Sequence, residues 1–66
     1  MAIVKVIEVL SSSTKSWEDA TSQAVEKASQ TVKNIRSAYV QDQSVSVKND
    51  KVTEYRVTLK ITFELV

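Results

Sequence analysis

The sequence predicts an α+β fold in which one helix packs on a three-stranded antiparallel sheet, with the elements in the order β-α-β-β. Two periodicities carry this prediction. The last stretch, Val52 to Val66, alternates apolar and polar residues, whereas Trp17 to about Asn34 repeats its apolar residues with a period near 3.6. Two further stretches rich in β-branched residues flank the helix. All 66 residues are therefore expected to form one domain, residues 1–66.

The last stretch is the longest predicted strand, and its side chains sort onto two faces because successive residues of a strand point to opposite sides. One face holds the residues Thr53, Tyr55, Val57, Leu59, Ile61, Phe63 and Leu65, and the other holds Glu54, Arg56, Thr58, Lys60, Thr62 and Glu64. At about 3.3 Å per residue the strand spans roughly 43 Å, but a compact chain of this size has a diameter of roughly 28 Å. We expect the strand to extend beyond its own domain and its apolar face to be covered by a second copy.

The N-terminal half supplies a first strand and the helix. Ala2 to Leu10 has apolar residues on both faces, which predicts a strand covered on both sides. Ser11 to Thr14 is expected to form a loop, and Ser16 to cap the helix that begins at Trp17. Alanine dominates the apolar stripe, so the helix can lie close to the sheet. The stripe consists of Trp17, Ala20, Ala24, Ala28, Val32 and Ile35.

The second strand, Arg36 to Val47, contains an irregularity. Its apolar residues before and after the polar run Gln41 to Gln43 are in opposite phase, which predicts a β-bulge within that run. Lys48 to Lys51 is expected to form a tight hairpin turn, because Asn and Asp tolerate a positive φ where no glycine is available. The two last strands then form an antiparallel hairpin, and the first strand adds to their sheet.

Composition excludes several classes of site. The chain has neither Cys nor His, which rules out disulfides, thiolate or imidazole metal sites and the usual nucleophile triads, so we expect no enzyme. The net charge of +1 with interspersed signs predicts no nucleic-acid binding. No signal peptide and no membrane-spanning stretch is recognisable, so the default expectation is a cytoplasmic protein without membrane contact. A domain this small favours association as its means of stabilisation.

Carboxylate oxygens remain as ligands for Ca²⁺ or Mg²⁺, particularly where copies meet on a symmetry axis. The candidates are Glu18, Asp19, Glu26 and Asp42. Their spacing does not match an EF-hand, and an alternative interpretation is that they are helix-capping and surface acids.

Several stretches together make the chain resemble a dodecin over almost its entire length. They are Ser16-Trp17-Glu18-Asp19-Ala20, Ile35-Arg36, Glu54-Tyr55-Arg56-Val57 and Phe63-Glu64-Leu65. The resemblance implies a hollow homododecamer built from trimers, whose relatives mostly bind flavins such as FMN or riboflavin and store or sequester them without catalysis.

The resemblance also implies pocket positions, and two of them depart from the flavin-binding pattern. Ser37 stands where flavin-binding dodecins carry a Trp that stacks on the ring, and Arg56 stands where they carry a Gln. Stacking contributes about 1 kcal/mol beyond area burial, and Arg has donors but no acceptor. Asp42 and Gln43 complete the implied set. We therefore expect weakened flavin binding.

Dodecins without this Trp form a subgroup described as calcium-binding, and the chain is similar to that subgroup as well. The alternative function is then a calcium-binding or purely structural dodecamer without an organic ligand. Glu18, Asp19 and Asp42 are the metal ligands that we expect in that case.

Overall fold

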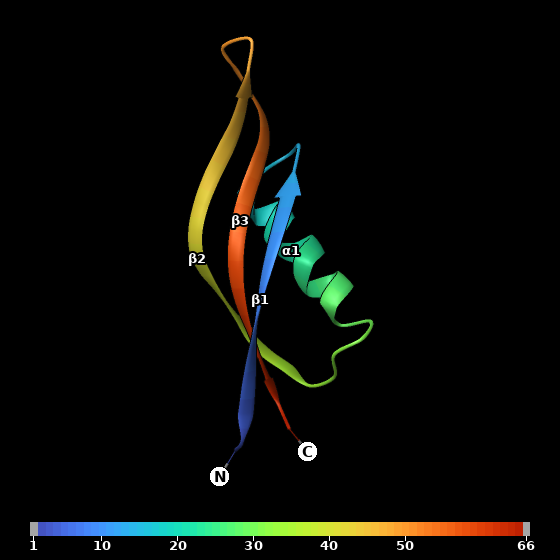
Figure 1. The fold of residues 1–66 in the computed structure, drawn as a ribbon. Helices are drawn as coiled ribbons and strands as arrows, with labels where there is room; N and C mark the ends of the chain where they lie inside the picture. The colour runs from blue at the N-terminus through green and yellow to red at the C-terminus, as the bar shows by residue number, and fades with distance from the viewer. Residues whose placement is uncertain (1, 66) are drawn as a thin grey trace.

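The computed structural model describes residues 2–65, and it confirms the predicted fold class and element order. The elements are β1 (Val4–Ser13), α1 (Trp17–Ala28), β2 (Ile35–Lys48) and β3 (Lys51–Glu64) (Figure 1). The sheet has the order β1-β3-β2, and both strand pairs are antiparallel. The longest predicted strand is thus the central one, bonded along both of its edges.

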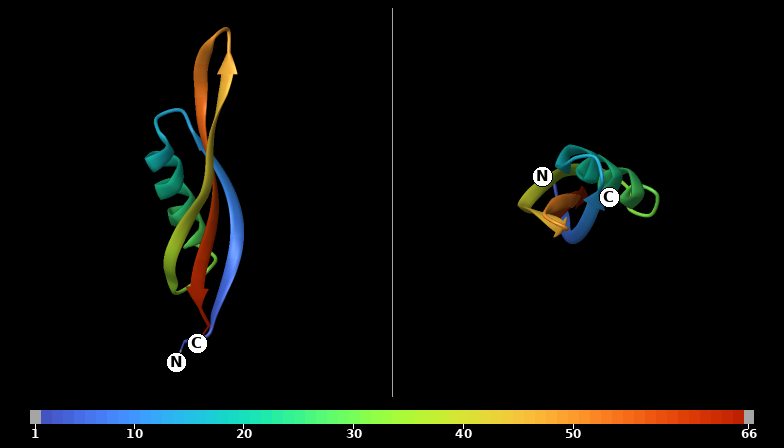
Figure 2. Two further views of the ribbon diagram at one scale, coloured as in Figure 1. Left: turned by 90° about the vertical axis from the view of Figure 1, so that its left-hand side faces the viewer. Right: turned by 90° about the horizontal axis from the view of Figure 1, so that it is seen from above.

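The core lies between the central strand and the helix. Val57, Leu59 and Ile61 alternate along β3, and all three are buried. Ala20 and Ala24 are the buried residues of α1, as the alanine stripe predicts, and their small side chains let the helix lie directly on the sheet. The helix covers one face only, as the two views in Figure 2 show. Within residues 2–65, no element covers the other face of the sheet (Figure 2).

The molecule is elongated, with extents of 50 × 20 × 13 Å. Its radius of gyration is 13.5 Å, compared with about 11 Å for a compact chain of this length. β2 and β3 have 14 residues each, whereas α1 has 12 residues and spans only about 18 Å. The β2–β3 hairpin therefore extends past the end of the helix (Figure 2), which confirms the predicted overhang.

Two predicted boundaries on the N-terminal side are wrong. The helix ends at Ala28 instead of near Asn34, and the chain then turns, with the Val32 amide donating to the Ala28 carbonyl at 2.8 Å. Asn34 has a φ of 63°, which redirects the backbone into β2. Ser11 to Ser13 are not loop residues, because the long β3 offers them ladder partners from Val57 to Tyr55. The apolar periodicity did not show that the helix ends at Ala28, where the chain turns back toward β2.

The hairpin contains the predicted irregularity and two more. A register shift between Val40 and Asp42 confirms the bulge, and others occur between Ile35 and Ser37 and between Ser46 and Val47. The last shift leaves Thr53 as an extra residue in β3, so the predicted unbroken alternation is wrong at the start of that strand. The hairpin turn is confirmed: Asn49 and Asp50 have φ values of 53° and 64°.

Candidate functional site

The sheet face turned away from the helix, called the open face below, is not covered by any other element of residues 2–65 (Figure 2). Residues directly opposite each other in an antiparallel pair share a face, so the strand register assigns its members. They are Val4, Val6, Glu8, Leu10 and Ser12 of β1, Ser37, Tyr39, Asp42 and Ser44 of β2, and Arg56, Thr58, Lys60 and Thr62 of β3. Leu10 and Tyr39 are 69% and 66% exposed. The open face thus combines apolar side chains with hydroxyl and charged groups.

Three of the four pocket positions implied by the sequence lie on the open face. Arg56 belongs to the row of β3 side chains that points away from the helix. Two residues of β2 pair with members of that row, Ser37 with Thr62 and Asp42 with Thr58. Gln43 pairs instead with Val57, which is buried under the helix, so Gln43 belongs to the opposite face. The bulge after Val40 decides this facing, because one extra residue inverts every position that follows.

Ser37 and Arg56 do not meet within one chain. Ser37 is opposite Thr62, and Arg56 lies six residues away from Thr62 on the same strand, which corresponds to about 20 Å. No small planar ligand touches both positions of a single copy. A pocket that uses both must therefore combine Ser37 of one copy with Arg56 of another.

Arg56 lies in a shallow depression of its own. Ser12 of β1 and Ser44 of β2 are its direct cross-strand neighbours. The depression has a volume of about 180 Å³ and is lined by Leu10, Ser11, Ser12, Ser44, Arg56, Val57 and Thr58. Neither serine was predicted from the sequence, although continuing the strand alternation beyond Leu10 would have placed Ser12 on the same face as Leu10.

Trp17 fixes the backbone of this region from the helix side. Its indole Nε1 donates to the Ser44 carbonyl at 3.0 Å, and its ring meets Tyr55 edge-on, with ring centroids 5.2 Å apart. The two interactions tie the start of α1 to both strands of the hairpin. Ser44, one wall of the depression, is therefore held in place by the single tryptophan of the chain.

The predicted metal ligands are not brought together within one copy. Glu18 and Asp19 lie in the first turn of α1, and Asp42 lies on the open face. Asp19 Oδ2 already accepts from Ser13 Oγ at 2.6 Å and from Gln23 Nε2. Among residues 2–65 no three acidic side chains gather into a cluster that could hold a metal ion. A carboxylate site made by these residues requires contributions from several copies.

The pKa of Asp19 is lowered, chiefly because its carboxylate accepts the Ser13 hydroxyl; desolvation opposes this shift, and Gln23 and Lys15 add smaller contributions in the lowering direction. A carboxyl whose pKa is lower in the folded state stabilises the fold above its unfolded pKa of about 3.9 and loses that contribution as the pH falls through the folded value. We therefore expect Asp19→Asn to lower the melting temperature at pH 7 but to have much less effect below pH 3.

Thermal melts of the wild type and Asp19→Asn between pH 7 and pH 2.5 check this expectation. Glu18→Gln is the matched control, because it removes an exposed carboxylate from the same helix turn. A stability difference for Asp19→Asn that stays constant over the whole pH range would contradict the assigned role of the carboxylate.

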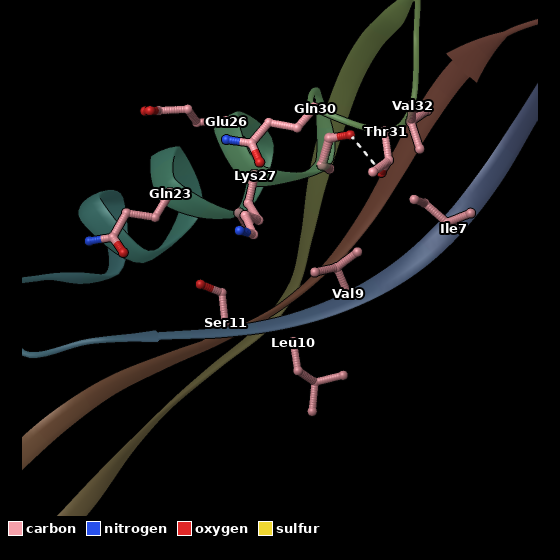
Figure 3. Close-up of a pocket in the computed structure, with 12 residues that line it drawn as sticks. Ile7, Val9, Leu10, Ser11, Gln23, Glu26, Lys27, Gln30, Thr31 and Val32 are labelled. Atoms are coloured by element: carbon pink, nitrogen blue, oxygen red, sulfur yellow. Dashed lines mark hydrogen bonds between the residues drawn. The ribbon is translucent and has the colours of Figure 1, made fainter.

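A second concave surface lies between α1 and the edge strand β1. This groove has a volume of about 890 Å³, and its apolar lining comes from Ile7, Val9, Ala24, Ala28 and Val32. Figure 3 shows Ile7, Val9 and Ser11 on the side of β1 that faces the helix, whereas Leu10 points away from it. The Ser11 hydroxyl donates to the Ala20 carbonyl at 2.9 Å, so it is already engaged. The groove offers apolar contact area and no grouping typical of catalysis.

Comparisons with known proteins agree on one family. Residues 3–66 match the family model described as Dodecin. The calcium dodecin of Mycobacterium tuberculosis is 35% identical over 65 residues, which cover 98% of this chain and 92% of that protein.

Solved structures of dodecins share the fold. The crystal structure of the calcium dodecin, a calcium-chelating antigen with a novel calcium-binding site, gives a TM-score of 0.84 at 35% identity, covering 97% of this chain and 91% of the other. The dodecin of Streptomyces coelicolor gives a TM-score of 0.93 at 28% identity, covering 98% and 93%. In the part of the chain that the structure describes, no helix has the length and hydrophobicity needed to cross a membrane.

Proposed function

We propose a function from the premise that this chain belongs to the dodecin family, whose members form homo-oligomers and are binding or storage proteins. Twelve copies assemble from trimers into a hollow shell that binds a small ligand and catalyses no reaction. The observation that carries this proposal is the long sheet with one uncovered face, which bears both exposed apolar residues and three of the four implied pocket positions.

Burial of apolar surface supports the assembly. Each copy exposes Val4, Val6, Leu10 and Tyr39 on the open face and leaves the groove between α1 and β1 unfilled. Covering such surface contributes roughly 25 cal/mol per Å², and a core of five buried residues gives one isolated copy little stability of its own. The shell therefore supplies the stabilisation that neither disulfides nor a structural zinc site provides here.

Separate copies supply the two halves of the ligand pocket. Ser37 and Arg56 lie about 20 Å apart on one copy but on the same face, so both can line one pocket only where two copies meet. The ligand class is that of the family, FMN or riboflavin, and its binding is weakened because Ser37 provides no ring to stack on and Arg56 provides no acceptor. A cytoplasmic location remains a prediction from the sequence.

A calcium-binding or purely structural shell is the second candidate, and the relation to a calcium dodecin favours its calcium form. Glu18, Asp19 and Asp42 would then act as ligands drawn from neighbouring copies. Calcium takes six to eight oxygen ligands, which exceeds what the dispersed carboxylates of one copy offer.

Thermal melts of the purified assembly separate the two candidates. A ligand present at 100 times its dissociation constant stabilises by about 2.7 kcal/mol, so binding of riboflavin or of Ca²⁺ raises the melting temperature measurably. Stabilisation by riboflavin alone supports the flavin-family proposal. The calcium shell is supported if Ca²⁺ raises the melting temperature, EDTA reverses this rise and Mg²⁺ does not reproduce it. The rise in melting temperature with Ca²⁺ should also be lost in Asp42→Asn. No response to either ligand leaves a structural shell and contradicts both binding proposals.

A further inference from the structure

Arg56 is a cation that forms no ion pair among residues 2–65. The ion pair formed within residues 2–65 is that between Arg36 and Glu64, at 2.9 Å, and Arg56 takes part in none. Arg56 lies on β3, the central strand of the sheet, so its side chain is flanked by β1 and β2 and does not lie at a free edge. A guanidinium carries five donors and no acceptor, so the group that binds it must present acceptors, and an oxyanion presents several charged ones.

The neighbours of Arg56 add donors and an apolar wall. Ser12 and Ser44 lie directly across from it on β1 and β2, and Thr58 follows it on the same face of β3. The Ser44 and Thr58 hydroxyls can donate to an oxygen held by the guanidinium, and the Ser12 hydroxyl can do so when it leaves its long contact to Glu54. Leu10, 69% exposed, lines the same depression and supplies hydrocarbon surface beside the polar groups.

We propose that the depression around Arg56 binds an oxyanion, a phosphate or carboxylate group attached to a small apolar or aromatic body. The guanidinium takes two oxygens of the anion in its planar fork, the serine hydroxyls donate to the same group, and Leu10 contacts the apolar body. This inference names the ligand class for one half of the open face, and it rests on the proposed function in assuming the assembled shell.

Two carboxylates near Arg56 oppose such a ligand. Glu54 lies two residues before Arg56 on β3, and its Oε2 accepts from the Ser12 hydroxyl at 3.4 Å, a long contact. Asp42 pairs with Thr58, one step diagonal to Arg56. Both repel an anion, so removing either charge strengthens oxyanion binding. Asp42→Asn therefore has opposite effects on an oxyanion, which it favours, and on Ca²⁺, which it disfavours.

The test uses the purified assembly with phenyl phosphate and benzoate as anionic probes. Benzyl alcohol is the neutral probe, because it has the same aromatic ring but no negative charge. Binding is measured by calorimetry and by the fluorescence of Trp17, whose indole bonds to the Ser44 carbonyl beside the site. The variants are Arg56→Gln, Arg56→Lys and Asp42→Asn. Lys60→Gln is the matched control, because it removes a positive charge from the same face about 13 Å away.

The expected result is saturable binding of one or both anionic probes and none of benzyl alcohol; the stronger anion tells whether the group is phosphate or carboxylate. Arg56→Gln weakens binding about tenfold or more, Arg56→Lys less, and Lys60→Gln less than about twofold. Asp42→Asn tightens it severalfold. An intact shell that binds neither anion, or binds them equally in Arg56→Gln, overturns the inference and leaves the proposed function standing. A chain that never assembles contradicts the proposed function instead.

Discussion

Leu59→Asp is expected to abolish folding and assembly together. Leu59 is fully buried at the centre of β3, where it packs against the cluster that contains Ala20 and Ala24. A carboxylate without a partner costs several kcal/mol to bury, which is comparable with the whole stability of a small domain. Ile61→Asp has the same effect for the same reason. Far-ultraviolet circular dichroism and analytical ultracentrifugation of the two variants measure both losses.

Leu10→Asp is the matched control for the loss of folding. It makes the same chemical change on the neighbouring strand, but on the open face and at a side chain that is mostly exposed. We expect this variant to keep its secondary structure. A Leu59→Asp protein that remains a folded monomer would show that the long apolar face of β3 does not serve fold and assembly at once.

The paired change Ser37→Trp and Arg56→Gln is expected to raise riboflavin affinity by about a factor of ten or more. The added indole supplies a stacking surface worth on the order of 1 kcal/mol beyond its buried area, and Gln offers both a donor and an acceptor where Arg offers donors only. Because the two positions are about 20 Å apart on one copy, the gain requires the assembled shell. Quenching of riboflavin fluorescence on titration measures the affinity.

Gln43→Trp is the control for the paired change, since it adds the same aromatic ring to the same strand on the helix side of the sheet. It should leave riboflavin affinity unchanged. An intact shell in which the paired change also has no effect would mean that no flavin pocket exists between copies. Riboflavin carries no phosphate, so Arg56→Gln moves its affinity and that of an oxyanion in opposite directions.

Much of the fold follows from local patterns, because those patterns report directly on burial. The alternation of Val57, Leu59 and Ile61 places the core on one face of the central strand, and the alanines of the helix indicate close packing. The bulge near Asp42 was visible as a change of phase. The end of the helix at Ala28 was not, because the apolar spacing continues to Val32 after the chain has already turned.

The site was less predictable, because it depends on facing and on other copies. Gln43 could be assigned to a face only once the position of the extra residue in β2 was known. Ser12 was expected in a loop, and it joins Arg56 only because β3 is long enough to pair with it. The carboxylates Glu18, Asp19 and Asp42 are dispersed over one copy, so no pattern along a single chain shows whether they meet.

Native mass spectrometry of the freshly purified protein tests the central claim most directly. The claim is that the overhanging hairpin and the open face belong to a closed shell of copies. We predict a single species at twelve times the chain mass of 7.4 kDa, which persists at low protein concentration. A folded monomer as the dominant species would contradict the account, because the exposed apolar residues of the open face would then have no partner.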